Sequence, residues 1–134
     1  IKDIKKVIGS QSLVISIEAK KRSNNKWEVF IENGREPTKI DVIDWIKKVN
    51  KLGCGEILLT SIDFEGTREG FDYNLYKIAS KVSKCPVIAS GGAGNLDHIK
   101  KLSKKTNCSA VALADLLHVQ NYKIDKIKKN LDII

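Results

Sequence analysis

Acidic and hydroxyl side chains stand where several expected strands of this sequence end. They are Glu18 after the apolar run 12–17, Thr60 and Asp63 at the end of the run 56–62, and Asp115 after the run 110–114. Carboxylates are common general acids and bases, and the carboxyl ends of parallel strands meet on one rim of a sheet. Converging carboxylates therefore predict a reactive site, although Asp63 taken alone can equally be a cap or a loop hydrogen bond.

A glycine-rich segment, Ser90-Gly91-Gly92-Ala93-Gly94, lies between an expected strand and an expected helix. Glycines let backbone N–H groups approach an anion at the start of a helix, which is the chemistry of a phosphate site. Tight strand-to-helix turns also use glycines, so a phosphate site and a plain turn both remain open. In an eight-stranded barrel, phosphate groups recurrently bind at the loops after the last two strands. If the four strands expected here were the second half of such a barrel, this loop, which follows the third of them, would be one of those two.

Strand patterns recur along the chain at positions that would present these residues. Short apolar runs predict four strands, near 13–17, 56–62, 86–90 and 110–114. An alternating piece at 27–31 follows the turn residues 23–25, which predicts a hairpin within 20–35. Each of the four strands is followed by a helical pattern, so the sequence predicts a parallel sheet of the α/β class.

The helical patterns carry their own start signals. Asp41, Asp72 and Asn95 are residue types suited to cap the helices that follow them. A last helix is predicted from the spacing of Ile124, Ile127 and Leu131.

Composition indicates one globular domain over residues 1–134, because 42% of the residues are hydrophobic and 30% are charged. No apolar run approaches the roughly 18–20 residues of a membrane span, and residues 1–20 lack a secretory signal, so a cytoplasmic location without membrane contact is expected. The chain begins at Ile1, within a lysine-rich helical pattern, which predicts a fragment of a longer protein.

The net charge of +8 invites a nucleic-acid interpretation, which the residue types disfavour. Only Arg22, Arg35 and Arg68 among the 24 basic residues are arginine. The lysines fall on the polar faces of expected helices, which predicts solvated surface and no nucleic-acid partner.

Cysteine and histidine provide no metal framework in this sequence. Cys54, Cys85 and Cys108 each precede an expected strand, so they are expected at one end of the sheet as loop residues. His98 and His118 have no partner at ligand spacing and are assigned structural roles. No metal and no cofactor is therefore expected.

Several segments of the sequence resemble those of a known protein family. The segments 9–12, 55–63, 66–67 and 89–94, with Gly70 and Asp72, resemble the cyclase subunit of imidazole glycerol phosphate synthase of histidine biosynthesis. The run Gly-Glu-Ile-Leu-Leu-Thr-Ser-Ile-Asp at 55–63 is highly specific for it. The resemblance covers the whole chain and implies a single (β/α)4 half-barrel over residues 1–134, the carboxyl-terminal half of a (β/α)8 TIM barrel.

The resemblance also implies a reaction and a partner. In that family a separate glutaminase subunit forms a heterodimer with the cyclase and releases ammonia, which travels through the barrel. The ammonia attacks a bisphosphorylated ribulosyl nucleotide and yields imidazole glycerol phosphate and an aminoimidazole carboxamide ribotide, a lyase-type reaction. Two carboxylates serve as acid and base, which suits a ring closure that moves protons on opposite sides of the substrate.

Family roles transfer to this sequence residue by residue. Glu18 matches a catalytic aspartate, and Glu56 matches a charged gate residue at the ammonia-entry end. The expected substrate and phosphate positions are Thr60, Asp63, Gly66, Ser90, Gly91, Gly92 and Asp115.

Several residues depart from the family pattern. Glu18 and Glu65 replace aspartates, Pro37 and Lys39 alter a loop, and Asp115 stands where the family has a phosphate-binding serine. A carboxylate repels a phosphate, so Asp115 is expected to turn away or to pair with a cation, Lys20 or Arg68.

These departures raise two alternative functions. Ser10-Gln-Ser12, Lys39 and residues 94–98 look similar to paralogues that use ammonia to amidate sugars of bacterial surface polysaccharides. In the other alternative the barrel is non-catalytic and only binds and activates its glutaminase.

Overall fold

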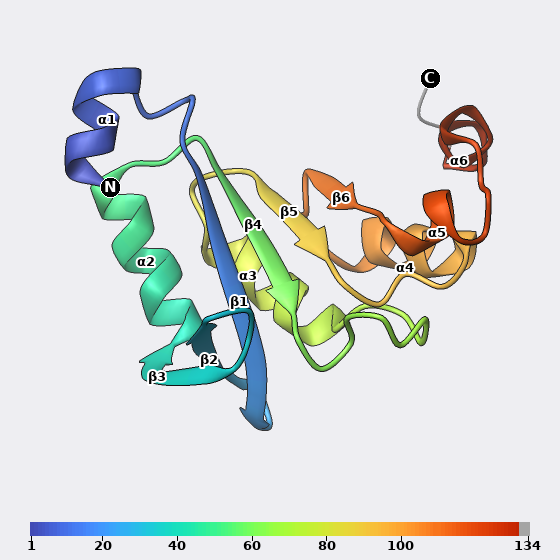
Figure 1. Ribbon diagram of the computed structural model, residues 1–134, viewed down its shortest axis with the longest axis horizontal. Helices are drawn as coiled ribbons and strands as arrows, with labels where there is room; N and C mark the ends of the chain where they lie inside the picture. Colours follow the sequence, from blue (N-terminus) through green and yellow to red (C-terminus); the bar gives the residue numbers. More distant parts are fainter. Residues whose placement is uncertain (132–134) are drawn as a thin grey trace.

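The computed structural model contains one six-stranded sheet flanked by helices (Figure 1). It describes residues 1–131. The strand order is β3-β2-β1-β4-β5-β6. The strands are β1 (Val14–Ser23), β2 (Lys26–Ile31), β3 (Glu36–Asp41), β4 (Glu56–Ser61), β5 (Val87–Ser90) and β6 (Ala110–Ala112). Strands β1, β4, β5 and β6 are mutually parallel, which confirms the predicted α/β class. This arrangement is that of half a (β/α)8 barrel.

Helices follow the parallel strands as predicted, and one further helix precedes the first strand. They are α1 (Lys2–Ile8), α2 (Val42–Leu52), α3 (Tyr73–Val82), α4 (Leu96–Lys105), α5 (Asp115–His118) and α6 (Ile124–Asn130). The three predicted caps are confirmed, because the side chains of Asp41, Asp72 and Asn95 accept backbone N–H groups in the first turns of α2, α3 and α4. Within residues 1–131, no helix is both long and apolar enough to cross a membrane.

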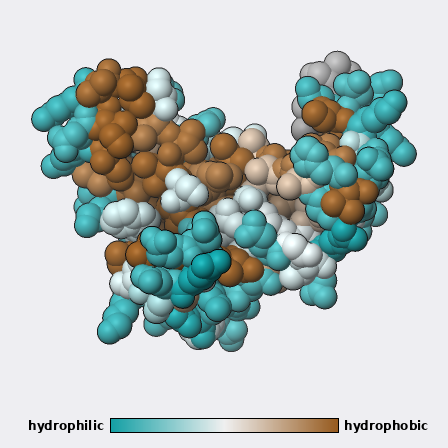
Figure 2. Space-filling model, in the orientation of Figure 1, coloured by the Kyte–Doolittle hydropathy of each residue, from teal (hydrophilic) through white to brown (hydrophobic). Residues whose placement is uncertain are grey.

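The core lies between one face of the sheet and helices α2, α3 and α4. Ile17, Ile57 and Leu59 on the strands and Ile46 and Leu75 on the helices are all fully buried. The opposite face is open, and Val14 on it is 48% exposed. Figure 2 shows apolar side chains gathered over α1 and across the hollow between α1 and α5. The sheet is therefore covered on one side only.

The predicted hairpin within 20–35 is present, and it is longer than predicted. Strand β1 pairs antiparallel with β2 from Glu18 to Ser23, and β2 pairs with β3, which the sequence patterns did not reveal. Pro37 lies in β3 at the outer edge of the sheet, where a residue without an N–H donor is tolerated. Trp27 of β2 donates its Nε1–H to Asp72 Oδ2 at 2.7 Å and so fastens the hairpin to the start of α3.

One expected boundary differs near the end of the chain. Strand β6 ends at Ala112, two residues before the predicted end at 114. In the last helix Ile127 is buried, whereas Ile124 is 56% exposed. The apolar spacing predicted this helix, and the structure confirms it over Ile124–Asn130, with Leu131 at its C-cap.

Candidate functional site

A row of side chains crosses the open face of the sheet near its carboxyl end. Strand register places Glu18 beside Thr60, Thr60 beside Ser90, and Ser90 beside Ala112. Residues in register on parallel strands point to the same face. Three of the expected site residues, Glu18, Thr60 and Ser90, therefore form one layer on the open face, although they are widely separated in sequence.

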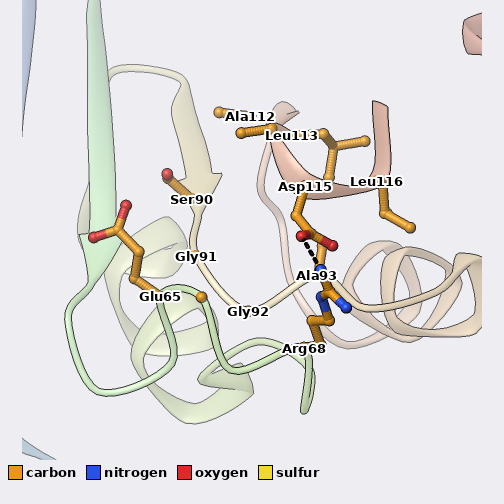
Figure 3. A pocket seen from close by; sticks show the side chains of 12 residues that line it. Glu65, Arg68, Ser90, Gly91, Gly92, Ala93, Ala112, Leu113, Asp115 and Leu116 are labelled. Atoms are coloured by element: carbon orange, nitrogen blue, oxygen red, sulfur yellow. Dashed lines mark hydrogen bonds and ion pairs between the residues drawn. The ribbon is translucent and has the colours of Figure 1, made fainter. Parts of the chain in front are cut away.

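Just beyond this layer, the loops after β4, β5 and β6 enclose a cavity of about 310 Å³. Its lining contains five expected substrate or phosphate residues, Gly66, Ser90, Gly91, Gly92 and Asp115. The remaining lining residues are Glu65, Arg68, Ala93, Ala112, Leu113, Ala114 and Leu116. Figure 3 shows Glu65 on one side of the glycine loop and the Arg68–Asp115 pair on the other.

The glycine loop forms the tight strand-to-helix turn that was one of its two possible roles. Gly92 has φ 98°, and a Cβ there would lie 1.9 Å from the carbonyl oxygen of Gly70. A Cβ on Gly94 would lie 2.1 Å from the carbonyl oxygen of Arg68. The glycines thus allow the loops after β4 and β5 to pack backbone against backbone, which is a structural requirement independent of any ligand.

Backbone donors in the same loop remain available to a ligand. Among the described residues, the N–H groups of Gly91, Gly92 and Ala93 donate to no protein acceptor. The Gly94 N–H instead donates to His98 Nδ1 at 3.1 Å, so His98 supports the loop structurally. Free N–H groups beside a cavity are suited to bind the oxygens of an anion.

Asp115 is held by an ion pair with one neighbour and a hydrogen bond from another. Arg68 Nη2 donates to Asp115 Oδ1 at 2.6 Å, and Gln120 Nε2 donates to Asp115 Oδ2 at 2.7 Å. The Arg68 guanidinium first, and the Gln120 amide second, lower the pKa of Asp115. The expectation that a cation offsets this carboxylate is confirmed for Arg68. Lys20 lies elsewhere, with its Nζ 5.4 Å from the centre of the Phe30 ring.

Two expected site carboxylates bind backbone N–H groups and do not line the cavity. Glu18 Oε2 accepts the Gly34 N–H at 2.6 Å, which joins β1 to the turn between β2 and β3. Asp63 Oδ2 accepts the Lys21 N–H at 2.7 Å, which joins the loop after β4 to β1. Asp63 thus has the loop-stabilising contact that the sequence left as an alternative, while one oxygen of Glu18 is held at the end of the open face.

Glu56 lies at the opposite end of the same face. It is four residues before Thr60 on β4, which corresponds to about 13 Å along an extended strand. Between the two lies a row of apolar side chains, Leu58, Ile88 and Ala110, which are neighbours in register. One charged residue therefore stands at the amino end of the face and one, Glu18, at the carboxyl end.

Sequence reasoning missed two contributors to the site. Gln120 follows Asp115 by five residues, a spacing that no common motif marks, and its role depends on the turn after α5. Glu65 was noted only as a departure from the family, yet it lines the cavity. Among residues 1–131, no three His, Cys, Asp or Glu side chains are grouped so as to hold a metal ion.

Comparison with known proteins places these features in a family. The sequence profile of the family described as "Histidine biosynthesis protein" matches residues 1–123. The chain is 48% identical over 128 residues to imidazole glycerol phosphate synthase subunit HisF of Prochlorococcus marinus (strain MIT 9515), covering 94% of this chain and 50% of that protein. It is 47% identical over 131 residues to the subunit of the same name from Dictyoglomus thermophilum, covering 98% of this chain and 52% of the relative. The chain thus spans about half the length of the curated relatives it matches.

Proposed function

Since this chain belongs to the family of histidine biosynthesis proteins, we propose that it forms the carboxyl-terminal half of a cyclase barrel of imidazole glycerol phosphate synthase. The observation that carries the proposal is the cavity at the carboxyl ends of β4, β5 and β6, where free backbone N–H groups and an arginine surround a space of about 310 Å³. In eight-stranded barrels this is the recurrent position of a phosphate group.

The proposal of a half-barrel is supported by the open edges of the parallel sheet. Strand β2 pairs with β1 only from Glu18 onward, so within residues 1–131 the segment 14–17 has no hydrogen-bonded neighbour on that side. Strand β6 is the other edge among the described residues. Four further strands would pair with both edges and cover the apolar face, which matches relatives of twice this length.

In the proposed reaction, ammonia attacks a bisphosphorylated ribulosyl nucleotide, which is then cleaved and closed to imidazole glycerol phosphate. Glu18 acts as one acid/base group, since one of its oxygens is held by the Gly34 N–H on the layer that faces the barrel interior. The other half of the barrel supplies the second carboxylate. The amides of Gly91, Gly92 and Ala93 bind one substrate phosphate.

The proposed partner is a glutaminase subunit that docks at the amino end of the strands. Glu56 lies at that end, and the apolar row of Leu58, Ile88 and Ala110 separates it from Glu18. A neutral ammonia molecule can pass an apolar layer that excludes ions, because transfer of a charge into apolar surroundings is strongly unfavourable. Glu56 is proposed as the gate where ammonia enters.

One observation favours the second function, ammonia transfer to a sugar. The Arg68 guanidinium is paired with Asp115, so the cavity offers a phosphate less positive charge than an unpaired arginine would. An acceptor with fewer phosphates than the histidine intermediate would suit such a cavity.

The experiment is a turnover assay on the complete protein with ammonium as nitrogen source and the ribulosyl nucleotide as acceptor. Formation of imidazole glycerol phosphate, and its loss in Glu18→Gln, is expected. Calorimetric titration with inorganic phosphate separates binding from chemistry, and Glu18→Gln is expected to keep phosphate affinity within about threefold because Glu18 does not line the cavity. Phosphate binding without turnover would favour the sugar acceptor. If the protein neither binds phosphate nor turns over the substrate, the remaining function is that of a non-catalytic barrel that activates its glutaminase.

A further inference from the structure

Two thiols face each other at the amino end of the sheet, opposite to the proposed phosphate site. Cys54 lies in the loop that leads from α2 into β4, and Cys85 lies in the loop that leads from α3 into β5. Their Sγ atoms are 3.0 Å apart, and the Cys54 thiol donates to Cys85 Sγ. The Cys85 thiol in turn lies 3.2 Å from the Cys54 carbonyl oxygen, so both side chains are oriented by the pair itself. Both are free thiols.

The register of the sheet sets this proximity. Ile57 of β4 and Val87 of β5 are neighbours in register, and the Ile57 N–H donates to the carbonyl oxygen of Pro86. The residues just before these two positions are therefore also adjacent. Cys54 and Cys85 are 31 positions apart in sequence, yet they occupy equivalent places at the entrances of adjacent strands.

The two cysteines differ in access to solvent. Cys54 is buried, and Cys85 is only partly buried. Burial first, and the neighbouring Cys85 second, raise the pKa of Cys54 to about 12, so Cys54 stays a protonated thiol at neutral pH. Cys85 is therefore the group that a dissolved reagent can reach first.

Cys108 provides an internal comparison. It precedes β6 in the same way, and its backbone N–H donates to Thr106 Oγ1. Burial raises the pKa of its thiol as well. Among residues 1–131, Cys54 and Cys85 are the only cysteines whose thiols are hydrogen-bonded to each other. Proximity to another thiol, and not burial alone, distinguishes the pair.

We propose that Cys54 and Cys85 form a redox-active dithiol, a modification site whose co-reactant is a low-molecular-weight disulfide such as glutathione disulfide. A disulfide bond is about 2.05 Å long, so the sulfur atoms need to approach by roughly 1 Å from their present separation. This inference does not depend on the proposed cyclase function.

The reaction proceeds in two exchange steps. Cys85 loses its proton to solvent and its sulfur attacks one sulfur of glutathione disulfide; the glutathione S–S bond breaks, and the departing thiolate takes up a proton. Cys54 then loses its proton and attacks the Cys85 sulfur of the mixed disulfide, which expels the second glutathione as a thiol. Two protein thiols are oxidised and one disulfide is reduced to two thiols.

The product would fasten the loop before β4 to the loop before β5. Such a bond closes a loop of about thirty residues and therefore restricts the unfolded chain. It would also stand two residues from Glu56, at the end of the sheet where the proposed partner docks.

The test equilibrates the complete protein in buffers with a graded ratio of reduced to oxidised glutathione, alkylates the remaining thiols after denaturation, and identifies the modified peptides by mass spectrometry. A cross-linked Cys54–Cys85 peptide that increases with the oxidised fraction is expected, while Cys108 remains alkylated. If Cys54 and Cys85 are both fully alkylated at the most oxidising ratio, or if Cys108 is the residue modified, the proposal is wrong.

Three single variants test the order of the steps. In Cys54→Ala, Cys85 is expected to retain glutathione as a stable mixed disulfide, because no second thiol can displace it. In Cys85→Ala, Cys54 is expected to remain a free thiol. Cys108→Ala is the matched control and is expected to form the cross-link to the same extent as the natural protein. Equal glutathionylation of Cys54 and Cys85 in the two variants would contradict the proposed order.

Discussion

At the scale of single residues, Asp115 and Arg68 form an ion pair in the lining of the cavity. A carboxylate next to the proposed phosphate position would be unfavourable, and here its two oxygens are occupied by Arg68 and Gln120. Because Arg68 first and Gln120 second lower the pKa of Asp115, the contribution of the pair to stability is fully present above the unfolded pKa near 4. It is lost only as the pH falls through the lower folded pKa.

Asp115→Ser is expected to tighten phosphate binding by about tenfold at low salt, because it removes a negative charge from the cavity and releases the Arg68 guanidinium. Calorimetric titration of the complete protein with inorganic phosphate measures this change. Asp125→Ser removes an equal charge from the first turn of α6 and is the matched control. Equal affinity for the natural protein and Asp115→Ser would exclude Arg68 as a phosphate ligand.

Gly92→Ala is expected to destabilise the protein by more than the roughly 1–3 kcal/mol of backbone strain, because the new Cβ would also meet the Gly70 carbonyl oxygen at 1.9 Å. Gly66→Ala is the control: its φ is 75°, but a Cβ there has no atom within 4 Å, so only strain of about 1–2 kcal/mol is expected. Urea unfolding measures both free energies. Similar values for the two variants would mean that the loops do not pack as described.

At the scale of elements, the β2–β3 hairpin is joined to the start of α3 by one buried hydrogen bond. Trp27 is almost fully buried, and its Nε1–H donates to Asp72 Oδ2, whose other oxygen caps α3 through the Leu75 N–H. The hairpin also supplies the Gly34 N–H that holds Glu18. The position of the proposed acid/base group thus depends on a strand pair outside the parallel sheet.

Trp27→Phe is expected to reduce the free energy of unfolding by about 1–3 kcal/mol, since it leaves a buried carboxylate oxygen without its donor. Trp45→Phe, in the partly exposed face of α2, is the control and is expected to lose no more than about 1 kcal/mol, the contribution of its contact with Lys48. Urea unfolding followed by circular dichroism distinguishes the two. A larger loss at Trp45 would mean that the hairpin is not anchored through Trp27.

At the scale of the whole molecule, the sheet has an uncovered apolar face and two open strand edges. Such surfaces bind other strands or other apolar faces, because unpaired backbone groups and exposed apolar area are both unfavourable in water. The proposed second half of the barrel would cover them in the complete protein.

Residues 1–134 expressed alone are therefore expected to self-associate, and light scattering measures this directly. Val14→Lys places a charge on the open face, where Val14 is 48% exposed, and is expected to reduce the association. Ile124→Lys, at an exposed position on α6, is the control and is expected to have little effect. A stable, monodisperse monomer of the natural sequence would argue against the half-barrel.

Local patterns in the sequence were sufficient for most of the elements. The alternation of strands and helices, the caps at Asp41, Asp72 and Asn95 and the glycine loop at 90–94 depend on residues within one or two turns of each other. Such interactions are encoded in short spacing, so they can be recognised in one chain. Strand β3 escaped recognition because it is an edge strand whose Pro37 and polar residues lack an alternating apolar pattern.

Only the tertiary structure decided which of these residues meet. Arg68 and Asp115 are 47 positions apart, and Cys54 and Cys85 are 31 apart. Sequence reasoning could name Arg68 as a candidate for Asp115, but it could not choose between Arg68 and Lys20. The choice depends on strand register and on the path of the loops, since a shift of one residue in register would turn each side chain to the other face of the sheet. The sequence therefore determined the elements and the kinds of chemistry they carry, and the packing of the sheet determined the partners.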